Sequence, residues 1–69
     1  MSYRALFIGG PIDGQERVLT ADHPHISVPA ATYRLLFAFG VPKTLVYSVW
    51  DVTETFSHVW HHYTGGKYA

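Results

Sequence analysis

The order of apolar and polar residues predicts a series of short β-strands. Residues 3–8 are largely apolar on both alternating faces, with Arg4 as the one charged residue, which indicates a strand inside a sheet. Residues 15–20 alternate as a half-buried strand does, and residues 26–28 predict a brief strand after a loop at Pro24, which cannot donate to a strand ladder. Residues 44–52 are rich in β-branched and aromatic side chains, so they predict the best-defined strand of the chain.

The segment 29–39 fits either a strand or a helix. Pro29 suits the first position of a helix, Gly40 suits its end, and several residues between them are good helix formers. As a strand, the same segment places every second residue on one face. We favour the strand, whose apolar face consists of Tyr33, Leu35, Phe37 and Phe39.

The segment 54–63 is ambiguous in the same way. Its apolar residues recur at helical spacing, and Asp51 and Glu54 are spaced as in a capping box. Apart from Glu54, however, most of its residues have low helix propensity, which favours a strand paired with residues 44–52 in a last hairpin. The helical spacing involves Phe56, Val59, Trp60 and Tyr63.

Residues 9–15 predict the turn of a β-hairpin. Pro11 fixes its own φ, Asp13 can bond nearby backbone amides, and Gly14 can adopt a positive φ. Two registers are open: a type I turn centred on Ile12 and Asp13 with Gly14 as a bulge, or a type I′ turn centred on Asp13 and Gly14. The residues that define this predicted turn are Gly9, Gly10, Pro11, Asp13 and Gly14.

Together these elements predict an all-β fold in a single domain, 1–69, with a flexible tail at about 65–69. We expect a small antiparallel sheet, or an SH3-like or OB-like barrel, of about five or six strands. The alternative is an α+β fold with a helix at about 52–64 and a second one at about 30–39.

The composition points to a protein partner. Hydrophobic residues form 48% of the 69 residues and aromatic residues 16%, whereas charged residues form only 14%. A chain this small cannot hide so much apolar surface, although scattered exposed apolar residues are also ordinary. We therefore predict partner binding, most simply as a homodimer. The predicted binding surface is aromatic and comprises Tyr47, Trp50, Trp60 and Tyr63.

The charges make several other partners improbable. Five basic and five acidic residues give a formal net charge of zero, and the basic residues are spread singly along the chain. This argues against nucleic-acid binding, although exposed aromatic rings are also what single-stranded nucleic acid stacks on. There is no cysteine, so disulfides and thiolate chemistry are excluded. No basic leader and no run of about 20 apolar residues occurs, so we expect no membrane association.

The five histidines are the residues best suited to metal chemistry. On a helix, His58, His61 and His62 lie at i, i+3 and i+4 and converge, whereas on a strand His61 points away from the other two. Because we favour the strand, we expect no metal and no cofactor, and this trio remains the alternative. No nucleophile elbow and no Gly-Lys-Ser/Thr phosphate loop is present, so we predict that the protein is not an enzyme.

The opening residues carry a resemblance to a known group. Small proteins of tailed bacteriophages and prophages often begin with a short strand and a Gly-Gly-Pro-hydrophobic-Asp-Gly turn, and residues 3–15 are similar to that start. A weaker similarity lies in Tyr33-Arg34 and in Val59-Trp60-His61. The group has no assigned activity, so the resemblance implies a phage origin and a mostly β fold and transfers no functional residue.

These observations lead to one functional expectation. The chain is expected to be a non-enzymatic phage or prophage accessory protein that binds another protein, either modulating a host protein or serving in phage assembly. Its place would be the cytoplasm of the bacterial host or the virion. The alternative is a histidine-rich metal-binding module or a small β module for single-stranded nucleic acid.

Overall fold

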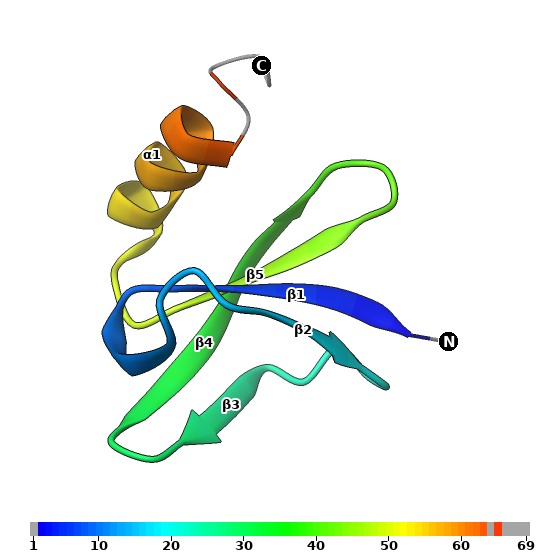
Figure 1. The fold of residues 1–69 in the computed structure, drawn as a ribbon, viewed down its shortest axis with the longest axis vertical. Helices are drawn as coiled ribbons and strands as arrows, with labels where there is room; N and C mark the ends of the chain where they lie inside the picture. The colour runs from blue at the N-terminus through cyan, green and yellow to red at the C-terminus, as the bar shows by residue number, and fades with distance from the viewer. Residues whose placement is uncertain (1, 64, 66–69) are drawn as a thin grey trace.

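The computed structural model describes residues 2–63 and 65. These residues form a five-stranded sheet, followed by one helix at the C-terminal end of the described chain (Figure 1). No helix in this part of the chain is long and apolar enough to cross a membrane. The elements in chain order are β1 (Tyr3–Ile8), the 3₁₀ helix η1 (Gly10–Ile12), β2 (Glu16–Leu19), β3 (His25–Val28), β4 (Ala31–Phe39), β5 (Thr44–Ser48) and α1 (Val52–Tyr63).

The sheet is curled into a half-barrel with the strand order β2-β1-β5-β4-β3 (Figure 1). This confirms the prediction of a small, mostly β, barrel-like fold. The sheet is mixed instead of purely antiparallel, because β1 and β5 pair in parallel. Each connection from one strand to the next reverses the chain, so β1 and β5 run in the same direction and can pair only in parallel once they are neighbours.

The inner face of the half-barrel holds the first of two cores. Its buried members come from three strands, and side chains from both edge strands, such as Leu19 and Ile26, pack against them. Contributions from all five strands to one cluster place it on the concave side of the sheet. The buried residues of this core are Ala5, Phe7, Tyr33, Leu45 and Tyr47.

The outer face holds the second core, and α1 covers it. Leu6, Ile8 and Val46 on the sheet meet Val59 of the helix, and partly buried aromatic residues surround them. Residues 3–8 were predicted to be apolar on both faces, and β1 does contribute to both cores. Only Thr55 and Val59 of α1 are buried, so the helix rests on the sheet along a narrow line.

A β-bulge in β4 divides the apolar face predicted for residues 29–39. The strand itself is confirmed, but its register with β5 shifts between Leu35 and Phe37. An extra residue in one strand reverses which face the following side chains occupy. Leu35 therefore packs on the inner core, whereas Phe37 and Phe39 pack on the outer core with α1. A helix at 30–39 is not formed.

The strand predicted for residues 54–63 is wrong, because this segment is the helix α1, as the alternative described. The carboxylate Oδ1 of Asp51 accepts a hydrogen bond of 2.7 Å from the backbone N–H of Glu54, so the capping spacing acts as an N-cap. The preceding strand ends at Ser48, four residues earlier than predicted. Packing on the sheet outweighs the low propensity of the individual residues. Residues 66–69 of the predicted tail lie outside the described residues.

The glycine turn reverses the chain as predicted, in the second of the two expected registers but with a different turn type. The backbone N–H of Gln15 donates to the carbonyl of Ile12 at 3.1 Å, which centres the turn on Asp13 and Gly14. Asp13 has φ −53° and ψ 130°, and Gly14 has φ 81°, which is a type II turn instead of type I′. The Asp13 carboxylate accepts a hydrogen bond of 2.7 Å from the N–H of Gly9 and closes the loop.

The hydroxyl of Tyr33 holds this loop against the inner core. It donates to the carbonyl of Gly9 and accepts a hydrogen bond of 3.1 Å from the N–H of Ile12. Its ring is fully buried and meets Phe7 edge to face, with 5.2 Å between the ring centres. One buried side chain of β4 therefore satisfies two backbone groups of a loop far away in the sequence.

Replacing Tyr33 by Phe is expected to destabilise the fold by about 1–3 kcal/mol, because the substitution leaves two backbone groups of the loop without their partner. Chemical unfolding followed by circular dichroism measures the loss. Tyr3→Phe, at a half-buried position, is the matched control and should change stability by no more than about 0.5 kcal/mol. Equal stability of the two variants would contradict the role given to the Tyr33 hydroxyl.

Replacing Asp51 by Ala is expected to lower the stability of α1 by about 1 kcal/mol, because the helix loses its N-cap acceptor. Thermal unfolding followed by the helical signal in circular dichroism measures this change. Asp51→Ser, which keeps an oxygen able to cap, should retain most of the stability. If Asp51→Ala unfolded at the same temperature as the wild type, the cap would not stabilise the helix.

Candidate protein-binding surface

The four aromatic residues predicted to bind a partner do not form one surface. Tyr47 is fully buried in the inner core, where its ring stacks on Phe7 with 5.4 Å between ring centres and 18° between planes. Its hydroxyl donates to the backbone carbonyl of His23. Tyr47 therefore holds the loop between β2 and β3 and does not belong to the molecular surface.

Trp50 and Tyr63 lie on the side of α1 that faces the glycine turn. Their rings flank His58, with ring centres 5.4 Å and 5.9 Å from that imidazole. A Cβ atom at Gly9 would lie 2.7 Å from the Trp50 indole, so the turn and Trp50 are in direct contact. Trp50 is half-buried, whereas Tyr63 is exposed. These two residues thus connect the helix to the turn.

Trp60 lies on the flank of the helix that faces away from His58, together with residues that were not selected from the sequence. Its ring centre is 5.7 Å from that of Phe56, which is in turn 5.7 Å from that of Phe37 on β4. Val52 lies one helical turn before Phe56 on the same stripe. We call Phe37, Val52, Phe56 and Trp60 the α1–β4 surface.

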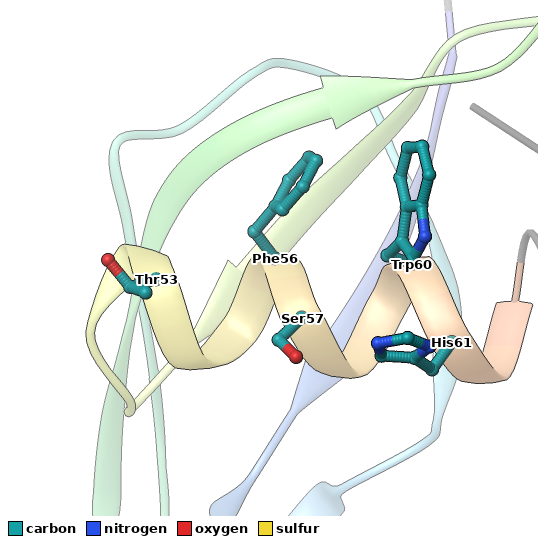
Figure 2. A pocket seen from close by; sticks show the side chains of 5 residues that line it. All are labelled: Thr53, Phe56, Ser57, Trp60 and His61. Carbon is teal, nitrogen blue, oxygen red and sulfur yellow. The ribbon is translucent and has the colours of Figure 1, made fainter. Parts of the chain in front are cut away.

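The α1–β4 surface continues into an open hollow along α1. Figure 2 shows Phe56 and Trp60 projecting from the same side of the helix, and Thr53, Ser57 and His61 complete the lining. The hollow has a volume of about 410 Å³. None of its lining residues is an Asp, Glu, Lys or Arg. An uncharged aromatic centre beside hydroxyl and imidazole groups is the arrangement found in protein interfaces, whose centres are depleted of charge.

Two of these residues had a detectable signal in the sequence. Phe56 and Trp60 are four residues apart, but this spacing brings them together only on the helix, which we did not favour. Phe37 had no such signal, because its position on the outer face depends on the bulge in β4. The four aromatic residues selected from the sequence share only Trp60 with the α1–β4 surface.

The histidines of α1 do not converge as the alternative metal-binding trio would require. His58 and His62 are neighbours with 4.5 Å between ring centres, whereas His61 lines the hollow. Among the residues that the structure describes, no group of three His, Cys, Asp or Glu side chains is arranged to hold a metal ion.

The comparisons with known proteins identify no relative. No family model matches the chain, and neither the curated proteins nor the solved structures contain a match. The assignment of a function therefore depends on the geometry of the molecule and on the resemblance of its opening residues.

Burial raises the pKa of Tyr47 above its usual value near 10, and the negative charge of Asp22 adds to this effect. The neutral phenol is thus favoured in the folded state, and its contribution to stability is complete below about pH 10 and lost at higher pH. Between pH 8 and pH 11 the wild-type protein should lose stability more steeply than Tyr47→Phe. Urea unfolding at each pH measures the difference, and parallel curves would contradict it.

Proposed function

We propose that this chain is a non-enzymatic protein that acts by binding another protein through its α1–β4 surface. One observation carries the proposal: Val52 and Phe56 remain 53% and 51% exposed on a helix that buries only two of its residues against the sheet. A helix that served only to cover the outer core would have polar residues at these positions. The exposed stripe is therefore suited to a second apolar contact.

The chemistry of the hollow defines the class of partner. Its centre is aromatic and without charge, so a partner that inserts an aliphatic or aromatic side chain buries apolar area without leaving a charge unpaired. Thr53, Ser57 and His61 offer hydrogen bonds at the edge. A nucleic acid would bring a phosphate charge for which this lining provides no cation.

The biological setting follows from the resemblance of residues 3–15 to the opening of small phage and prophage proteins. On this basis we assign the chain to phage or prophage accessory proteins, with a host protein or a phage assembly component as partner. Its place would be the host cytoplasm or the virion. A second copy of the chain is the simplest further partner, because a net charge of zero produces no long-range repulsion between copies.

Replacing Phe56 by Glu is expected to weaken partner binding by about tenfold or more, because it places a charge in the centre of the surface. Glu is a good helix former and Phe56 is half exposed, so the fold should persist. The measurement uses the wild-type protein and the variant as paired baits in lysate of a bacterial host. A protein that distinguishes the baits is then purified and its affinity determined by titration calorimetry.

Val18→Glu is the matched control, since Val18 is an apolar residue that is 75% exposed on β2, away from the α1–β4 surface. It should bind like the wild type. Analytical ultracentrifugation of the wild type, Phe56→Glu and Val18→Glu tests whether a second copy of the chain is the partner. Only Phe56→Glu should shift from the dimer towards the monomer. Partners and oligomers retained equally by both variants would overturn the proposal.

A further inference from the structure

The imidazoles of His58 and His62 lie side by side on α1, with 4.5 Å between their ring centres and 32° between their planes. The function proposed above does not involve this pair, because it lies on the flank of the helix opposite to Phe56 and Trp60. We propose that His58 and His62 form a two-imidazole site for a divalent transition-metal ion and that this site binds Cu²⁺ most tightly.

The spacing of the rings fits a shared ion. With a metal–nitrogen bond of about 2.1 Å, two imidazoles bound to one ion at a right angle hold their ring centres roughly 4.5 Å apart. The observed separation already has this value, so the two rings can share an ion without movement of the helix. Two histidines at i and i+4 on a helix are also the arrangement that binds zinc in many metalloproteases.

The surroundings position one ligand and leave the other accessible. His58 is half-buried, and its ring contacts Trp50 nearly at a right angle and also lies close to Tyr63. This packing limits the rotamers of His58 before an ion arrives, which lowers the entropy lost on binding. His62 is exposed, so an ion can approach the pair from solvent.

The number of ligands determines the kind of ion and its affinity. Two imidazoles alone leave further coordination positions of the ion open to water. Such an open site binds less tightly than a closed four-ligand site, and its selectivity follows the general order for nitrogen ligands, with Cu²⁺ above Ni²⁺ and Zn²⁺. Mg²⁺ and Ca²⁺ prefer oxygen ligands and are excluded.

The site exists only while the helix is formed. In an extended chain, residues four apart are separated by about 13 Å, so the two imidazoles cannot hold one ion. An ion that binds the folded state alone stabilises it, and at a free concentration 100 times its Kd it lowers the unfolding constant by about 100-fold. Metal binding thus stabilises a helix that buries only two residues on the sheet.

The test uses the full chain without a histidine tag, with CuCl₂, NiCl₂, ZnCl₂ or MgCl₂ added at pH 7.5. Thermal unfolding and titration calorimetry measure stability and affinity, and quenching of tryptophan fluorescence by Cu²⁺ reports an ion beside Trp50. His62→Ala should weaken binding by about tenfold or more, since the loss of even an outer-shell partner has that effect. His61→Ala, on the same helix, should bind like the wild type.

Several results would overturn the proposal. If His61→Ala and His62→Ala lost metal affinity equally, the ion would bind at another place. The same would follow if the double variant His23→Ala with His25→Ala lost metal affinity. An equal effect of Mg²⁺ would indicate unspecific binding to charge. Absence of any metal-dependent stabilisation in the wild-type protein would exclude the site, and partner binding through Phe56 would be unaffected by that result.

Discussion

The contact between Tyr33 and the glycine turn is the constraint on which the arrangement of both cores depends. The hydroxyl of Tyr33 reaches two backbone groups of the turn only because Gly10 has no side chain, since a Cβ atom there would lie 2.7 Å from that hydroxyl. On its other side the turn contacts Trp50, at the place where a side chain on Gly9 would collide. The turn thus connects the inner core with the residues that lead into α1.

The two cores differ in what they contribute to the molecule. The inner core is made by the sheet alone and contains the stacked rings of Phe7 and Tyr47, so it defines the half-barrel. The outer core needs the helix, and it receives Phe37 and Phe39 because the bulge in β4 turns them away from the inner face. The same bulge brings Phe37 next to Phe56, so a local irregularity of one strand creates part of the α1–β4 surface.

The strands at residues 3–8 and 44–48 were predictable because their residue types fit a buried strand, whereas the segment 29–39 also fitted a helix and was decided by its alternation. The prediction of a strand at residues 54–63 is wrong because helix propensity and hydrophobic periodicity disagree in this segment. The N-cap at Asp51 and the packing of Val59 on the sheet stabilise the helix. The burial of Tyr47 has no signature in the sequence, because a strand that is buried on both faces has no polar face to mark its inner side. Trp60 belongs both to the predicted set and to the α1–β4 surface, whereas the place of Phe37 depends on a bulge that has no signature in the sequence.

The parallel pairing of β1 with β5 has a consequence for the order in which the molecule assembles. The first strand of the chain sits between β2 and β5, and its partner on one side is not available until residues 44–48 have been made. During synthesis the β1–β2 hairpin must therefore wait, with one edge of β1 unpaired, until residues 20–48 have been made. Closure of that long loop joins both cores in a single late step, so the domain gains its structure cooperatively.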